Sequence, residues 1–131
     1  MKAFPVSMKR RHGARSERLH FLQDRSWRNS GPEGYEDEDI LAFNDIHPAR
    51  PVHVLVIPKK HITSLSTVTA DDTLVLGKIL AKANEIAVAQ GSPDGFRVII
   101  NTGRVGQQEV PHLHAHIVGG PDPVGPMLKR I

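Results

Sequence analysis

The stretch His112-Leu113-His114-Ala115-His116 decides how this sequence of 131 residues is interpreted. Successive side chains of a β-strand point to opposite faces, so the three imidazoles would share one face while Leu113 and Ala115 share the other. Neighbouring imidazoles on such a strand lie about 6.5–7 Å apart. Burying three imidazoles is costly unless their nitrogens find partners. Alternation this regular beside an apolar face therefore predicts a functional site.

Two kinds of chemistry fit three histidines on one face of a strand. Imidazoles are common zinc ligands, and a catalytic zinc site can use three of them. A neutral imidazole can instead attack phosphorus directly while its neighbours orient it. The sequence offers no other obvious carboxylate–histidine cluster. We therefore favour the nucleophile and keep the metal-dependent hydrolase as the alternative.

The segments around the histidines predict a mostly antiparallel sheet. Runs of apolar or β-branched residues predict strands at 40–43, 52–57, 96–101 and 111–118. No helix separates most of these strands along the chain, which is typical of an α+β domain rather than of a parallel sheet.

One segment between the strands has the spacing of a helix. Thr69 and Asp72 resemble a capping box at its start, and Gly91 stands where a glycine usually follows a helix. Apolar residues recur between them at helical intervals, namely Leu76, Ile79, Leu80, Ala83 and Ala87.

The charges divide the chain into two parts. Residues 1–34 hold eight Lys or Arg and three Asp or Glu, whereas residues 35–131 hold nine and eleven. We expect a basic N-terminal arm at 1–34, disordered or loosely packed, with no specific nucleic-acid partner, before a domain at 35–131. Without cysteines, a long apolar run or a signal-peptide pattern, the expected protein is soluble, cytoplasmic and free of disulfides.

Several further blocks stand around the histidines in a fixed order. They are residues 35–39 (YEDED), 41–43 (LAF), 56–62 (VIPKKHI), 101–103 (NTG), 108–110 (QEV), 117–118 (IV), 119–120 (GG) and 125–128 (GPML). Together with the histidines, these blocks resemble the histidine-triad (HIT) superfamily, in particular its Hint-like nucleotide-binding branch of bacterial type. The resemblance covers about residues 35–128. It implies a HIT domain with a five-stranded, mostly antiparallel sheet, one long helix, a short N-terminal helix and assembly into a homodimer.

The resemblance also implies an activity and the residues that carry it. A nucleotide hydrolase of this kind cleaves nucleoside phosphoramidates or nucleotide conjugates at the α-phosphorus. His114 would be the nucleophile and form a nucleotidyl-histidine intermediate. His116 would bind phosphate oxygens, and His112 with His53 would orient the site from behind.

The implied ligand is a purine nucleoside monophosphate or one of its conjugates. No metal and no cofactor is implied, because imidazoles and amides meet the phosphoryl charge. Backbone N–H groups of the 106–110 loop would cradle the phosphate. The residues implied to bind the nucleotide are Phe43, Asn44, Asp45, Ile46, Asn101, Gln107, Gln108, Glu109, Val110 and His116.

Simpler interpretations remain open for some of these residues. Asp45 also fits a plain turn residue, and His53 fits a satisfied histidine in an apolar strand. Gln107 stands where many relatives have glycine, and Glu109 where some have a serine that donates to the leaving group. A nucleotide-binding scaffold with negligible turnover is a third hypothesis for the chain.

The N-terminus departs from the resemblance. Relatives begin with Cys-x-x-Cys and a short helix, whereas this chain has Leu19–Gly34 and no cysteine. Codons that encode Leu19–Glu33 permit the family text when they are read one nucleotide later. We therefore hypothesise that residues 1–34 are an out-of-frame translation. The domain would then lack its first helix and any structural zinc that the two cysteines hold in relatives.

Overall fold

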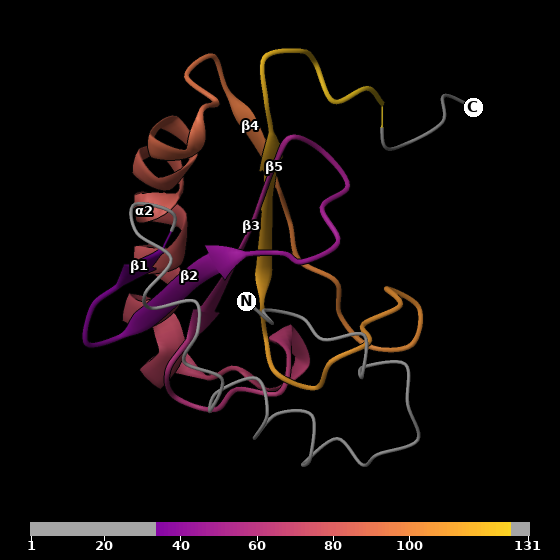
Figure 1. Cartoon of the computed structure of the whole chain (residues 1–131). Coiled ribbons are helices and arrows are strands. Elements are labelled where there is room, and N and C mark those ends of the chain that lie inside the picture. Colours follow the sequence, from indigo (N-terminus) through magenta and orange to yellow (C-terminus); the bar gives the residue numbers. More distant parts are fainter. Residues whose placement is uncertain (1–33, 127–131) are drawn as a thin grey trace.

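The computed structural model describes residues 34–126. Five strands form one antiparallel sheet in the order β1-β2-β3-β5-β4 (Figure 1). The strands are β1 (Tyr35–Glu36), β2 (Ile40–Asn44), β3 (Val52–Pro58), β4 (Phe96–Ile99) and β5 (Ala115–Gly119). The predicted α+β class with a five-stranded antiparallel sheet and one long helix is confirmed.

The long helix is α2 (Thr73–Gln90), and it follows two short 3₁₀ turns, η4 (Leu65–Thr67) and η5 (Ala70–Asp72). The predicted capping box is present at η5, where the Thr69 hydroxyl accepts from the N–H of Asp71 and the Asp72 carboxylate accepts from the N–H of Thr69. Gly91 ends α2 with φ of 108°, a left-handed conformation that suits glycine. The start and the end of the helix were therefore both predictable from single residues.

The two faces of the sheet have different cores. Helix α2 packs on one face (Figure 1), where β2, β3 and β5 supply Ile40, Ala42, Val54, Val56, Ala115 and Ile117. The other face has a smaller cluster of Leu41, Phe43, Leu55, Ile57 and Val110. His116 pairs with Leu55 in β3 and with Ile99 in β4. Side chains alternate along a strand, so His116 lies on the face away from the helix.

The strand that carries the histidines is shorter than predicted. It begins at Ala115 rather than near residue 111. Upstream of it, the N–H of His112 donates to the carbonyl of Val110, and the N–H of Leu113 donates to Ile62. A tight local bond at His112 replaces the regular ladder, so this part of the chain is irregular. The two-residue β1 went undetected because a strand of that length shows no periodicity.

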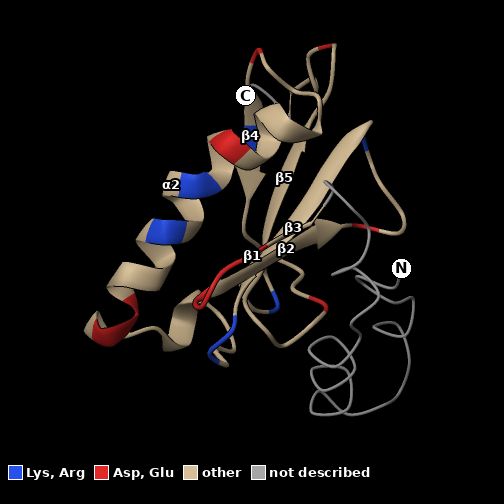
Figure 2. Ribbon diagram, turned by 60° about the vertical axis from the view of Figure 1, so that its left-hand side comes forward, with Lys and Arg blue, Asp and Glu red and all other residues tan. Residues whose placement is uncertain are grey.

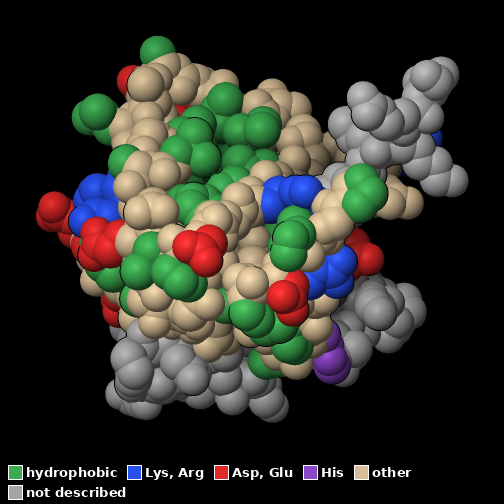
Figure 3. All heavy atoms as spheres, turned by 90° about the horizontal axis from the view of Figure 1, so that it is seen from above, with side chains coloured by type: hydrophobic (Ala, Val, Ile, Leu, Met, Phe, Trp, Pro, Cys, Tyr) green, Lys and Arg blue, Asp and Glu red, His purple; other side chains and the backbone are tan. Residues whose placement is uncertain are grey.

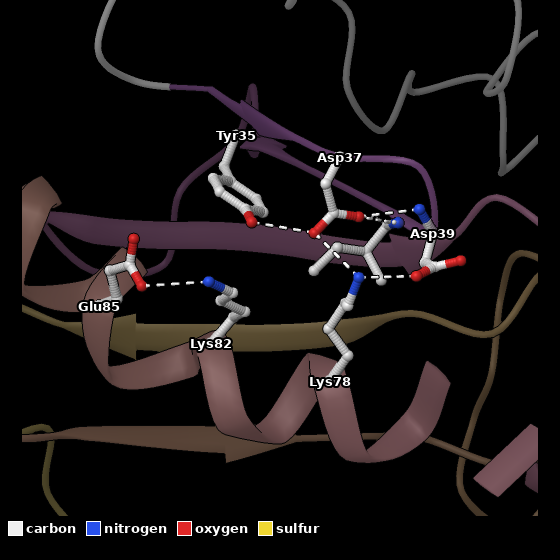
Figure 4. Close-up of polar contacts among 7 residues, drawn as sticks. Tyr35, Asp37, Asp39, Lys78, Lys82 and Glu85 are labelled. Atoms are coloured by element: carbon white, nitrogen blue, oxygen red, sulfur yellow. Dashed lines mark hydrogen bonds and ion pairs between the residues drawn. The ribbon is translucent and has the colours of Figure 1, made fainter. Parts of the chain in front are cut away.

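A polar cluster ties the turn between β1 and β2 to α2 (Figure 4). Burial opposes ionisation of Asp37, but the N–H groups of Asp39 and Ile40 donate to its carboxylate and lower its pKa to about 2. Tyr35 donates to the same carboxylate, and Lys78 from α2 lies 2.6 Å from Asp39. Figure 2 shows basic residues in α2 and acidic residues in the turn between β1 and β2.

The described surface mixes acidic and basic side chains. From above, charges of both signs lie among hydrophobic side chains (Figure 3). Within residues 34–126, no helix has the length and apolar character that crossing a bilayer requires. The predictions made for the arm at 1–34 and for a short N-terminal helix fall almost entirely outside the described residues.

Candidate active site

A pocket opens on the sheet face opposite α2, where the end of β2 meets β5 and the loop before it. Residues far apart in sequence line this pocket: Asp45, Asn101, Gly106, Gln107, Gln108, Glu109, His114 and His116. Seven of these eight residues had been assigned to the site from the sequence. Gly106 is the additional one.

His114 is held in one tautomer by the backbone. Its Nδ1 lies 2.7 Å from the carbonyl oxygen of His112. A carbonyl only accepts, so Nδ1 carries the proton and Nε2 keeps its lone pair. Burial lowers the pKa of His114, against the opposing effects of that carbonyl and of Asp45. His114 is thus a neutral imidazole whose Nε2 keeps its lone pair in the wall of the pocket.

A second chain of hydrogen bonds fixes His116. The N–H of Ala49 donates to Nδ1 of His53 at 2.9 Å, so the proton of the His53 ring sits on Nε2. That Nε2 lies 2.9 Å from Nδ1 of His116 and donates to it. The remaining nitrogen of His116, Nε2, must then carry a proton. It is a donor suited to an anionic oxygen in the pocket.

Both histidines of this relay stay neutral at physiological pH. Burial lowers the pKa of His116 to about 3, with further lowering from His114 and His53. Burial also lowers the pKa of His53, although the nearby Asp45 carboxylate opposes the effect. Neutral rings keep the donor and acceptor pattern of the relay intact.

Asp45 closes the pocket at the end of β2. Its N–H donates to the carbonyl of His53, and one carboxylate oxygen accepts from the N–H of His47 at 2.9 Å. The second oxygen lies 3.6 Å from Nε2 of His53. This placement combines the turn role and the site role that the sequence left as alternatives.

His112 contributes differently from the expectation. Its side chain is fully buried, and Nε2 lies 3.0 Å from the carbonyl of Pro58. Its Nδ1 lies 3.4 Å from Nδ1 of His61. The ring of His112 therefore bonds away from the pocket, and its backbone carbonyl is the group that positions His114. Likewise, His53 acts on His116 rather than on His114.

These tautomers argue against a metal ion bound by Asp45, His53 and His116 together. In the described residues, the carboxylate–histidine grouping at the pocket is Asp45, His53 and His116. A neutral imidazole has one lone pair. That of His53 is engaged by Ala49, and that of His116 by His53. A metal ion would have to break the relay to bind there.

The loop before β5 is built from its own hydrogen bonds. The N–H groups of Gly106, Gln107 and Gln108 donate to Thr102, Arg104 and Gly103, respectively. These three groups are therefore engaged within the loop. A phosphate cradle from this loop would then depend on the N–H groups of Glu109 and Val110, and it stays a prediction.

Three loop residues have special backbone or side-chain roles. Gln108 uses both ends of its amide, since Nε2 donates to the carbonyls of Thr63 and Val110 and Oε1 accepts from Gly103. Gln107 has φ of 60°, a left-handed conformation that glycine adopts more readily. A Cβ at Gly106 would lie 2.5 Å from the carbonyl oxygen of Thr102, so only glycine fits that position.

Four residues assigned to nucleotide binding do not line the pocket. The side chains of Phe43 and Val110 are buried in the smaller core cluster, and Ile46 packs against that cluster. Asn44 ends β2 beside Val54. Asn44 and Ile46 are the neighbours of Asp45 in the chain. Phe43 and Val110 belong to the core cluster on the same face of the sheet as His116.

Two contributors to the site were missed by the sequence interpretation. The N–H of Ala49 sets the tautomer of His53, and the carbonyl of Thr63 anchors Gln108. Both act through backbone atoms, so no side-chain pattern in the sequence marks them.

Comparisons with known proteins agree with this geometry. The family model for the HIT domain matches residues 34–122. Protein HitA of Neisseria gonorrhoeae is 51% identical over 87 residues, which are 66% of this chain and 81% of that protein. The purine nucleoside phosphoramidase of Escherichia coli K12 is 44% identical over 97 residues, which are 73% of this chain and 81% of the enzyme.

A solved structure shows the same fold. The HIT family hydrolase from Legionella pneumophila has a TM-score of 0.65 and 43% sequence identity, with 69% of this chain and 82% of that one covered. The family match begins at residue 34, where the basic arm ends. With its sheet, its histidines and these relatives, the chain belongs to the HIT domain family.

Proposed function

We propose that this protein is a metal-independent nucleotide hydrolase that cleaves nucleoside phosphoramidates or nucleotide conjugates at the α-phosphorus. The observation that carries the proposal is the bond from Nδ1 of His114 to the carbonyl of His112. It leaves Nε2 as a neutral nucleophile in the pocket wall. The similarity to a purine nucleoside phosphoramidase supports the substrate class and suggests a purine base.

The first step of the proposed reaction forms a covalent intermediate. Nε2 of His114 attacks the α-phosphorus, the bond from phosphorus to the leaving group breaks, and the leaving group takes a proton from solvent. Nε2–H of His116 donates to a non-bridging phosphoryl oxygen as negative charge builds there. Asp45 accepts hydrogen bonds from the ribose hydroxyls, and Asn101 contacts the nucleotide.

The second step releases the product. A water oxygen attacks phosphorus, the bond between phosphorus and Nε2 of His114 breaks, and the water proton leaves to solvent. The nucleoside monophosphate departs and His114 returns to its neutral tautomer. Its Nδ1–H stays on the His112 carbonyl throughout, so the ring does not need to reorient between steps.

A substrate panel with intermediate trapping tests this proposal. Adenosine and guanosine phosphoramidates and dinucleoside polyphosphates are assayed with and without a chelator, and quenched reactions are examined by mass spectrometry. We expect turnover that the chelator leaves unchanged and a nucleotidyl adduct on His114. Loss of activity in chelator would favour the metal-dependent hydrolase. Nucleotide binding without turnover or adduct would favour the scaffold.

We also propose that the protein acts as a homodimer. Strand β4 is an edge strand, and its four residues are half-buried in one chain. Leu80 of α2 is 57% exposed. An edge strand beside exposed apolar side chains suits a twofold interface. Sedimentation should give a dimer at micromolar concentration, and Leu80→Glu should shift it toward the 14.4 kDa monomer.

A further inference from the structure

Gln107 combines a strained backbone with a place in the wall of the pocket. Its φ of 60° lies in the left-handed region, which disfavours every residue that has a Cβ. Gly103, the other residue of this loop with a positive φ, is a glycine, whereas position 107 keeps a side chain. Gln107 also lines the pocket. Backbone strain at a pocket is typical of a functional role, so the side chain of Gln107 calls for one.

The loop holds Gln107 in a fixed position. The N–H of Gln107 donates to the carbonyl oxygen of Arg104 at 3.1 Å. The flanking N–H groups, those of Gly106 and Gln108, donate to carbonyl groups earlier in the same loop. Three consecutive backbone hydrogen bonds therefore fix the point from which the Gln107 side chain leaves the loop.

The loop lies at one end of the pocket, and Asp45 lies at the other. The N–H of Asp45 donates to the carbonyl oxygen of His53, near the start of β3. The side-chain amide of Gln108 donates instead to the carbonyl of Thr63, beyond the end of β3. Figure 1 shows the loop, in orange, beyond the end at which β5 begins. His116 pairs with the middle of β3 and therefore lies between the two ends.

This order places the leaving group of a substrate, and the placement rests on the proposed function. The nucleoside and the leaving group are different substituents of the same phosphorus. With the ribose at Asp45 and the phosphoryl group at His116, the leaving group extends toward the loop. Gln107 is therefore at the end of the pocket where the bond from phosphorus breaks.

Gln107 is also the loop side chain in the pocket wall that has a donor to offer. Both N–H groups of the Gln108 amide are used, because they donate to the carbonyls of Thr63 and Val110. An ionised Glu109 only accepts. Among the described residues of the loop that line the pocket, the carboxamide of Gln107 is thus the remaining side-chain donor.

We propose that Gln107 is a specificity-determining residue whose Nε2–H donates to the departing atom of the leaving group. When the bond from phosphorus breaks, its electron pair stays with that atom. Gln107 stabilises the pair by a hydrogen bond until the atom takes a proton from solvent. Such a donor helps most when the departing atom is strongly basic. Gln107 therefore extends the reaction to nucleotide conjugates with poor leaving groups.

A series of leaving groups tests this role in the full chain. The substrates are adenosine 5′-phosphoramidates of ring-substituted anilines, which vary the basicity of the departing nitrogen and leave the nucleotide unchanged. Gln107→Met keeps the length of the side chain and removes the donor. It should lower kcat about tenfold for the most basic aniline, the scale of one hydrogen bond, and less for the least basic. The dependence of log kcat on aniline basicity should therefore be steeper than in the parent.

Two further variants separate this role from the structure of the loop. Gln107→Gly should give the same steeper dependence while it gains thermal stability, because glycine adopts a positive φ without strain. A merely structural role would not move activity and stability in opposite directions. Val105→Ala changes a residue of the same loop that is 85% exposed and lies outside the pocket wall, and it should keep the dependence of the parent.

The outcomes distinguish this proposal from the proposed function. If the parent hydrolyses the series and Gln107→Met shows the same dependence on aniline basicity, the role of Gln107 is wrong and the hydrolase function stands. If the parent neither hydrolyses the series nor forms an adduct on His114, the hydrolase function is wrong, and the role of Gln107 is wrong with it.

Discussion

The molecule contains two histidine pairs that differ in where their protons are held. In the pair His53–His116, a backbone N–H occupies one nitrogen and forces the rings into a one-way relay of donors. In the pair His61–His112, Nε2 of His112 donates to a backbone carbonyl, and a hydroxyl that can donate or accept lies beside His61. The two pairs therefore differ in the kind of group that sets the proton positions of their rings.

The largest expected effect is at His114, the proposed nucleophile, which lies in the pocket with His116 of the first pair. His114→Ala should lower kcat by several orders of magnitude and leave nucleotide binding largely intact, as for loss of a covalent catalyst. His61→Ala, in the other pair, should lower kcat by less than about tenfold. Steady-state kinetics with equilibrium nucleotide binding measures both. Turnover close to that of the parent in His114→Ala would contradict the proposed covalent mechanism.

The next effect concerns the relay itself. His53→Ala removes the donor to Nδ1 of His116 and should lower kcat by about 10²-fold, the usual scale for a misplaced donor to a developing oxyanion. His53→Gln retains an N–H donor and should recover part of the loss. If Ala and Gln have the same effect, then packing rather than tautomer control explains the role of His53.

Acid should act on stability through the first pair. The pKa of His116 is about 3 in the fold, below its ordinary value of 6.5. The unfolded chain therefore binds more protons, and this contribution to stability is complete above pH 6.5 and is lost as pH falls toward 3. Between pH 7 and 4.5 the free energy of unfolding should drop by about 2 kcal/mol from this residue.

Denaturant unfolding at both pH values measures the drop, and His116→Gln is the matched variant. Its stability should depend less on pH than that of the parent. The unfolding curve of Asp37→Asn serves as a second reference, since the pKa of Asp37 is about 2 and its effect falls at lower pH. An unchanged slope in His116→Gln would contradict the assignment of a neutral, buried ring.

The smallest expected effect is at the loop beside the first pair. Gln107 has φ of 60°, and Gln107→Gly should raise the free energy of unfolding by up to about 1 kcal/mol by relieving that conformation. Thermal unfolding measures the change. Gly103 also has a positive φ, so the reverse kind of substitution, Gly103→Ala, should lower the free energy of unfolding. Equal shifts in both variants would rule out backbone strain as the cause.

The sequence predicted the parts of this protein that side-chain chemistry encodes. Period-two alternation predicted the strand that contains His116, although β5 begins only at Ala115, and Thr69 with Gly91 marked both ends of the helix region. The family resemblance identified most of the pocket lining, including Asp45 and Asn101. These features depend on residue type and spacing, which the sequence displays directly.

The remaining features depend on backbone atoms and on packing. The sequence could not reveal that Ala49 donates to His53, or that His112 turns toward His61, because irregular segments set both contacts. Val110 was assigned to the ligand, and its side chain is buried in the core cluster that contains Phe43 and Leu55. The out-of-frame hypothesis for residues 1–34 stays a prediction that sequencing the gene tests.

The proposed nucleophile, His114, depends on a hydrogen-bond acceptor that no side-chain replacement deletes. Nδ1 of His114 bonds to the carbonyl oxygen of His112, and all amino acids carry that oxygen. Substitutions at position 112 therefore report on the buried ring and its neighbours, and they leave the carbonyl that accepts from His114 in place. An ester in place of the amide between His112 and Leu113, made by chemical synthesis, would weaken this acceptor, and it would also remove the N–H of Leu113 that donates to Ile62. This carbonyl oxygen is therefore kept by every point mutation at position 112, whether natural or engineered.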